Sequence, residues 1–285
     1  MKGICRLYDI EDELLESHIF PKFTIDYFKM TGSKYLRNFI QPNKRLQDGP
    51  KTFLLSQRAE HEFSLREKWF AENIFIPYLT QNRRVFKYDE NLFYFSVSLL
   101  WRALLININH PNVVVQPFLP LLKEAENEWK LFLKDYKFPM THNRSYLFFT
   151  DRIIAHNIET AGVDYYMTRA LDATIVSNQN ETFVAVYAKF LRFIFWGILK
   201  GGDEVKISDL KINPLTGELR IPQKFEDGTM TSFFMSRIKE LENLPKPSEK
   251  QQDKILDEIL KDKEGFLKSD AGQSITNDYI NLDPK

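Results

Sequence analysis

The sequence contains very little cysteine, since the one thiol in 285 residues is Cys5. A single cysteine cannot form an internal disulfide, and such sparse use is typical of proteins of the reducing cytoplasm. Long apolar runs are also missing: the most apolar stretch, 190–199, contains Arg192 and is shorter than the ~20 residues that cross a bilayer. The start of the chain reaches Asp9 and Glu11 without an apolar signal region. We therefore expect a cytoplasmic protein without a membrane segment.

The formal net charge is zero, because 39 lysines and arginines balance 39 aspartates and glutamates. A neutral chain is not steered as a whole toward nucleic acid. The sequence shows no internal repeat and no glycine-rich phosphate loop. Apolar and aromatic residues are abundant, with 43% hydrophobic residues and 24 phenylalanines. This composition excludes disorder over most of the length and predicts a substantial core.

Basic residues gather in one segment, 22–58, where eight lysines and arginines face only Asp26 and Asp48. Such a local excess favours contact with phosphate, although solvated loops often have the same composition. Binding to DNA or RNA through so small a patch is expected to be weak and to fall as salt rises. The candidate nucleic-acid-binding residues are Lys22, Lys44, Arg45, Lys51 and Arg58.

Apolar spacing and turn residues divide the chain into three regions and predict an α+β fold dominated by helices. Residues 1–80 combine short strand-like pieces with a helix over 57–79 that is kinked or ended at Pro77. Residues 81–245 form a helical body with a small antiparallel sheet. Residues 246–285 form a charged C-terminal helix and tail.

Within the body, the stretch 91–108 is apolar on nearly all sides and predicts a buried central helix. The remaining elements follow from periodicity and turn residues. Further helices are expected at 117–136, 187–200 and 232–244, strands at 146–150, 165–176 and 182–186, and a hairpin at 210–221.

The C-terminal region carries one apolar stripe between alternating charges. An isolated helix of this kind is marginal in water, so we expect residues 249–269 to dock, either on their own chain or on a partner or second copy. Residues 270–285 are expected to fray. The stripe consists of Ile255, Leu256, Ile259, Leu260 and Leu267.

Two N-terminal motifs point to a lineage. The first is Ser17-His18-Ile19-Phe20-Pro21-Lys22-Phe23, and the second is Leu54-Leu55-Ser56-Gln57-Arg58-Ala59-Glu60-His61. Over about residues 3–80 the chain resembles the HNH (ββα-metal, treble-clef-like) endonucleases, and in particular an uncharacterised bacterial subgroup with a Ser-His-Ile-x-Pro-Lys-Phe motif. The resemblance implies an N-terminal ββα element in which a strand and a following helix present the site residues.

The resemblance also implies roles for individual residues. His18 falls at the position of the general base that activates water toward a phosphodiester. Asp48 and Glu60 complete the catalytic set, and Asp48, Glu60 and His61 are the candidate ligands of a divalent ion such as Mg²⁺. The plainer alternatives are a hydrogen-bonded structural His18, a helix-dipole role for Glu60 and a surface position for His61.

The chain departs from the family at its zinc knuckle. Such a site holds zinc through four thiolates, whereas here Tyr8, Ser56 and Ala59 stand where cysteines are expected and only Cys5 remains. No structural zinc is therefore expected. Hydrophobic packing must replace the metal in holding the element together.

Three functions remain open from the sequence. The first is a nuclease-derived protein with lost or impaired catalysis that binds nucleic acid or protein, in a phage-defence setting associated with the family. The second is an active Mg²⁺-dependent endonuclease that uses His18. The third is an unrelated enzyme with a site within 140–235, which requires a deep pocket with convergent polar groups.

Overall fold

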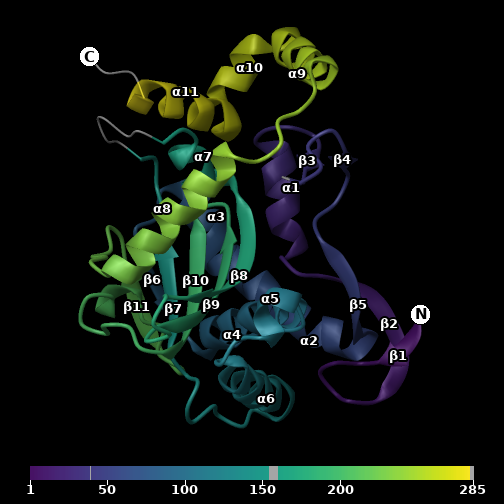
Figure 1. Cartoon of the computed structure of the whole chain (residues 1–285), viewed down its shortest axis with the longest axis vertical. Helices are drawn as coiled ribbons and strands as arrows, with labels where there is room; N and C mark the ends of the chain where they lie inside the picture. The colour runs from purple at the N-terminus through teal and green to yellow at the C-terminus, as the bar shows by residue number, and fades with distance from the viewer. Residues whose placement is uncertain (39, 154–159, 283–285) are drawn as a thin grey trace.

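The computed structural model describes residues 1–38, 40–153 and 160–282, and shows a mixed α+β fold. Figure 1 shows the C-terminal helices at the top of the molecule, a four-stranded sheet with helices on both faces in the middle, and the N-terminal strands at the lower right. No helix among these residues is both long and apolar enough to span a membrane. The predicted fold class is confirmed.

The N-terminal element is an antiparallel sheet followed by a helix. Strands β1 (Lys2–Ile4), β2 (Glu11–His18) and β5 (Lys51–Ser56) pair in the order β1-β2-β5, and α2 (Gln57–Phe70) follows β5 directly. The order β2, β5, α2 is the expected ββα arrangement. Between β2 and β5 lie α1 (Lys22–Met30) and a two-residue ladder of β3 (Leu36–Arg37) with β4 (Arg45–Leu46).

The helix expected over 57–79 is present but changes pitch along its length. After α2 the chain passes through a π-helical turn, Ala71–Phe75, into α3 (Ile76–Gln81), which ends at Asn82 in the left-handed region (φ 51°). Pro77 lies in the first turn of α3, where the amide that proline lacks is least needed. The π-helical turn and Pro77 together lie where the sequence predicts that the helix is kinked or ends.

Helix α4 (Glu90–Asn107) forms the centre of the molecule. The Asp89 carboxylate caps it by accepting from the Asn91 amide at 3.0 Å, and every residue from 92 to 105 is buried. It packs against α2, α6 (Leu119–Asp135) and strands of the main sheet. The predicted central helix at 91–108 is therefore confirmed, and the short α5 (Pro111–Val114) links α4 to α6.

The main sheet is antiparallel throughout and has the strand order β7-β10-β9-β8. One face packs on α4, and the other face packs on α8 (Gly228–Glu242), as Figure 1 shows. Side chains alternate between these two cores, so that Phe195 joins the α4 side and Trp196 the α8 side. The strands are β7 (Ser145–Phe149), β8 (Leu171–Ser177), β9 (Val184–Phe190) and β10 (Phe193–Lys200).

The helix predicted at 187–200 is wrong, because this stretch is the β9–β10 hairpin. A strand that is buried on both faces is apolar at nearly every position, so its periodicity does not separate it from a buried helix. The hairpin turns at Leu191 (φ 50°) and Arg192. The following Gly201 and Gly202, both with positive φ, end a strand rather than a helix.

Two more predictions need correction. The strand expected at 165–176 begins as α7 (Val163–Arg169), and only its second half is β8. The hairpin expected at 210–221 does not form, because β11 (Gly217–Arg220) pairs with β6 (Val85–Tyr88) and Lys211 bridges to Tyr146 instead. Pairing partners far away in sequence decided both cases.

The C-terminal region forms three helices: α9 (Glu249–Lys261), α10 (Lys263–Lys268) and α11 (Asp270–Leu282). The expected continuous helix over 249–269 is broken at Asp262, whose side chain caps α10 by accepting from the Gly265 amide. The expected burial of its stripe holds only in part: Ile255 and Ile259 are half-buried, whereas Leu256, Leu260 and Leu267 are 54%, 58% and 47% exposed. The expected fraying of 270–285 is also wrong as far as residue 282, because α11 packs on α7.

Candidate functional site

The end of β2 and the start of β5 bring three polar side chains together. His18 closes β2 and is paired in register with Lys51 of β5, while Asp48 lies in the loop just before that strand. The His18 Nε2 atom lies 3.1 Å from Asp48 Oδ1, and Lys51 Nζ lies 2.6 Å from Asp48 Oδ2. Asp48 therefore joins the histidine to the lysine.

The Asp48 carboxylate is held in its charged form. Burial acts to raise its pKa, but hydrogen bonds from Lys51, His18 and the Gly49 amide outweigh burial and hold the pKa of Asp48 well below its usual range. Both carboxylate oxygens thus have donors from within the protein. The His18 side chain is 20% exposed, so one side of this group faces solvent.

A second charged pair lies behind His18 and was missed in the sequence. Arg102 of α4 donates to the His18 carbonyl at 3.0 Å, and its guanidinium lies 2.8 Å from Glu67 of α2 and over the Phe63 ring. The Arg102 side chain is only 2% exposed. Burial raises the pKa of Glu67, and the Arg102 charge opposes that rise. The sequence contains one clue to this buried pair, because Arg102 is the one charged residue between Asn91 and Ile108.

The remaining metal candidates lie on α2 in different environments. Glu60, in the first turn, has one carboxylate oxygen that is buried without a hydrogen-bond partner among the described residues. His61 is exposed, and its carbonyl accepts from the Ser64 hydroxyl. Within the described ranges, no three His, Cys, Asp or Glu side chains are grouped closely enough to hold a metal ion.

Mg²⁺ favours uncommitted carboxylate oxygens. Asp48 is already bound by His18 and Lys51, and Glu67 is already bound by Arg102. Among the carboxylates around His18, only Glu60 keeps a buried oxygen without a hydrogen-bond partner in the described part of the chain.

The positions at which the resemblance implies zinc-binding thiolates come from two segments that meet in space. The Cys5 thiol, fully buried, accepts a hydrogen bond from the Ser56 amide at 3.4 Å. Ala59 is equally buried in the same core, and the Tyr8 ring lies under the Arg58 guanidinium at 4.5 Å. The Ser56 hydroxyl is buried and has no partner among the described residues. Apolar packing holds the positions at which the resemblance implies thiolates.

The predicted basic patch is divided among three places. Lys22 and Lys51 lie near His18, at the start of α1 and of β5, and each contacts an aspartate. Lys44 and Arg45 lie at the β3–β4 ladder, where Arg45 pairs with Glu258 of α9 at 3.0 Å. Arg58 lies in α2, beyond the far end of β5, a strand that itself spans ~17 Å at ~3.3 Å per residue. The five residues thus come from α1, the β3–β4 ladder, β5 and α2.

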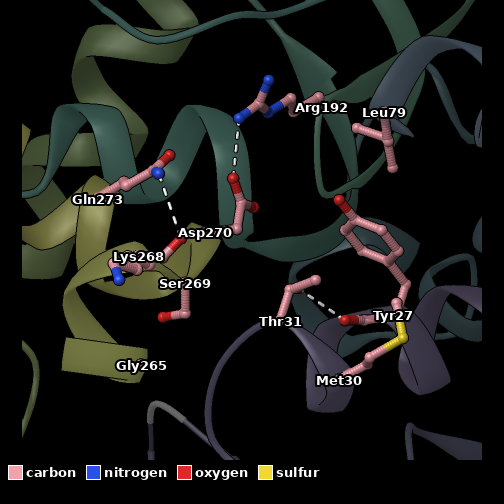
Figure 2. Close-up of a pocket in the computed structure, with 10 residues that line it drawn as sticks. All are labelled: Tyr27, Met30, Thr31, Leu79, Arg192, Gly265, Lys268, Ser269, Asp270 and Gln273. Carbon is pink, nitrogen blue, oxygen red and sulfur yellow. Dashed lines mark hydrogen bonds and ion pairs between the residues drawn. The ribbon is translucent and has the colours of Figure 1, made fainter. Parts of the chain in front are cut away.

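A polar cavity of about 480 Å³ lies between α1 and the C-terminal helices. Figure 2 shows Arg192 pointing toward Asp270 across it, with Tyr27 and Thr31 on the α1 side. A second cavity of about 330 Å³ lies along α10 and α11. The stretch 140–235, of which 154–159 fall outside the described residues, contributes only Arg192 to the first cavity and Arg152 to the second. Neither cavity supports the deep pocket expected for an unrelated enzyme.

In comparisons with known proteins, no family model, no curated protein and no solved structure matches the chain.

Proposed function

We propose that the protein is nuclease-derived, has lost metal-dependent cleavage and acts as a nucleic-acid-binding protein. The observation that carries this proposal is that two carboxylates around His18 are each paired with a cation of the protein itself. Lys51 pairs with Asp48, which also hydrogen-bonds to His18, and Arg102 pairs with Glu67. A divalent ion would have to displace these donors.

The zinc-knuckle positions support the same descent. Cys5 and Ser56 come from segments 51 residues apart and are in hydrogen-bond contact beside the buried Ala59. Their convergence at the N-terminus of α2 is the arrangement that a lost zinc site would leave. The large core that α2 shares with α4 provides the stability that zinc provides in smaller elements.

An active endonuclease is the second candidate, and one observation favours it. His18 keeps a carboxylate partner at 3.1 Å, the arrangement that orients an imidazole for general-base work, and the buried Glu60 oxygen lacks a partner among the described residues. In this alternative, Asp48 would keep its bond to His18 and the ion would bind at Glu60.

Cleavage of plasmid and oligonucleotide substrates in Mg²⁺ or Mn²⁺ separates the two candidates. We expect no cleavage above background by the wild-type protein, and no difference between it and His18→Ala. Cleavage that depends on His18 and on the metal would establish the second candidate instead. Circular dichroism of both proteins, recorded beside the assay, shows that each is folded.

Binding itself is tested by anisotropy of labelled single- and double-stranded oligonucleotides over a salt series. We expect weak binding that falls steeply with salt, because exposed lysines contact phosphate. The double variant Lys22→Ala, Lys44→Ala should weaken the binding of oligonucleotides. The control double variant Lys224→Ala, Lys239→Ala, which lies outside the N-terminal element, should leave the binding unchanged. Absence of binding by the folded wild-type protein at low salt would refute the proposed function.

A further inference from the structure

Within the described residues, the polar contacts of helix α9 with the N-terminal part of the chain lie along one side of the helix. The Ser248 amide before it donates to Asn43 Oδ1 at 2.8 Å, Gln251 accepts from Arg37 at 3.4 Å, and Glu258 pairs with Arg45 at 3.0 Å. Gln251 and Glu258 are seven residues apart, so they share one face at 3.6 residues per turn. These contacts fix which side of α9 faces the protein.

The opposite side of α9 carries exposed leucines. Leu256 and Leu260 are 54% and 58% exposed, and α9 contains no fully buried residue. They follow each other at i, i+4 and thus lie one above the other. Two adjacent leucines on a helix that has already docked are not used by the described part of this chain.

A row of acidic residues runs beside the two leucines. Glu249, Asp253 and Asp257 are spaced by four residues, and Leu256 and Leu260 each lie three residues after a member of the row. All three are exposed, and none forms an ion pair with a described residue, including the lysines of α9. Like charges at i, i+4 destabilise a helix by ~0.2–0.5 kcal/mol per pair. The row therefore leaves three negative charges side by side on the surface of α9.

We propose that this face of α9, defined by Leu256, Leu260, Glu249, Asp253 and Asp257, docks a cationic amphipathic helix of a partner protein. The leucines supply the apolar contact, and the acidic row matches lysines or arginines spaced by four residues on the partner. A second copy fits less well, because an antiparallel two-fold pairing through these leucines places each acidic row against the other. The inference rests on α9 alone and does not depend on the proposed function.

The probe is a labelled synthetic peptide of about 15 residues, near the length at which an isolated helix is marginal in water. It carries two leucines spaced by four residues and, on the neighbouring side of the helix, three lysines spaced by four residues. The control peptide carries glutamates in place of the lysines. Calorimetry or anisotropy with the full chain should show saturable binding of the first peptide and at least tenfold weaker binding of the second.

Variants of the full chain test whether the peptide binds on α9. Asp253→Lys with Asp257→Lys should weaken the lysine peptide at least tenfold and improve the glutamate peptide, and Leu256→Ser with Leu260→Ser should weaken both peptides. Leu215→Ser, at a leucine that is 74% exposed elsewhere, should change neither. Equal binding of the two peptides, or binding unchanged by the α9 variants, would overturn the proposal. A concentration-dependent dimer in sedimentation equilibrium that is lost in the leucine variant would assign the face to a second copy.

Discussion

The guanidinium of Arg102 donates a hydrogen bond to the backbone carbonyl of His18 over 3.0 Å and thereby ties the central helix α4 to the end of β2. The same guanidinium lies against Glu67 of α2. One buried cation therefore contacts both the strand and the helix of the ββα element. The position of His18 depends on the body of the protein and not on the N-terminal element alone.

Arg102→Met should lower the free energy of unfolding by about 3 kcal/mol, because removing one partner leaves the largely buried Glu67 carboxylate without its cation. Urea denaturation measures the change. The double variant Arg102→Met with Glu67→Gln should recover part of the loss, since the uncompensated charge is gone. If the two single losses simply add, the pair is not coupled.

Thiols introduced beside Cys5 at the three other positions that the resemblance implies should create a zinc site. In the triple variant Tyr8→Cys, Ser56→Cys, Ala59→Cys, we expect one zinc per chain by elemental analysis and the visible absorption of a tetrahedral thiolate site when Co²⁺ replaces zinc. The wild-type protein and the single variant Ser56→Cys offer too few thiolates and should carry none. A folded triple variant that takes up no metal would mean that these positions do not converge as the resemblance implies.

Stability should rise with pH in the alkaline range because of Lys189. This fully buried side chain hydrogen-bonds to the Leu191 carbonyl, and burial lowers the pKa of Lys189 from 10.5 to about 7. Between these values the unfolded chain binds the proton and the folded protein does not, so unfolding becomes less favourable as pH rises, by about 1.4 kcal/mol per pH unit at most.

Urea denaturation at several pH values between about 7.5 and 9.5, below the usual tyrosine pKa near 10, measures this slope. Lys189→Met should flatten it, whereas Lys200→Met, an exposed position at the end of β10, should leave it unchanged. The same slope in all three proteins would show that Lys189 is charged in the folded state.

Asp270→Asn should loosen α11. The Asp270 carboxylate contacts the guanidinium groups of Arg152, Arg169 and Arg192 and is 13% exposed, so its loss leaves clustered positive charge. We expect about 3 kcal/mol less stability and faster hydrogen exchange across α11. Glu264→Gln, with a side chain that is 90% exposed, is the matched control and should change neither.

Elements with a distinct local signal could be predicted from the sequence. The apolar stretch 91–108 became α4, and the motif around His18 was placed at the end of a strand that pairs with the strand before α2. The approach of Asp48 to His18 was also anticipated as part of one site. Helix α4 follows from the patterning of one segment, whereas both expectations for His18 follow from the family resemblance.

Features decided by distant partners could not be predicted. Residues 187–200 were assigned to a helix because burial on both faces of the sheet removes the alternation that marks a strand. The role of Glu67 depends on Arg102, 35 residues further along the chain, and only tertiary packing brings the two together. The division of the basic patch among three places likewise depends on the paths of α1 and α9.

Arg169 contacts segments that are made at very different times during synthesis. Its guanidinium donates to the Phe28 carbonyl, to the Thr31 hydroxyl and to Asp270, so the end of α1 and the start of α11 meet at one side chain. Because these partners are 141, 138 and 101 residues away from Arg169, a ribosome-bound chain lacks the last of them until residue 270 has emerged. We therefore expect the closure of α1 against the C-terminal helices to be a late step of folding.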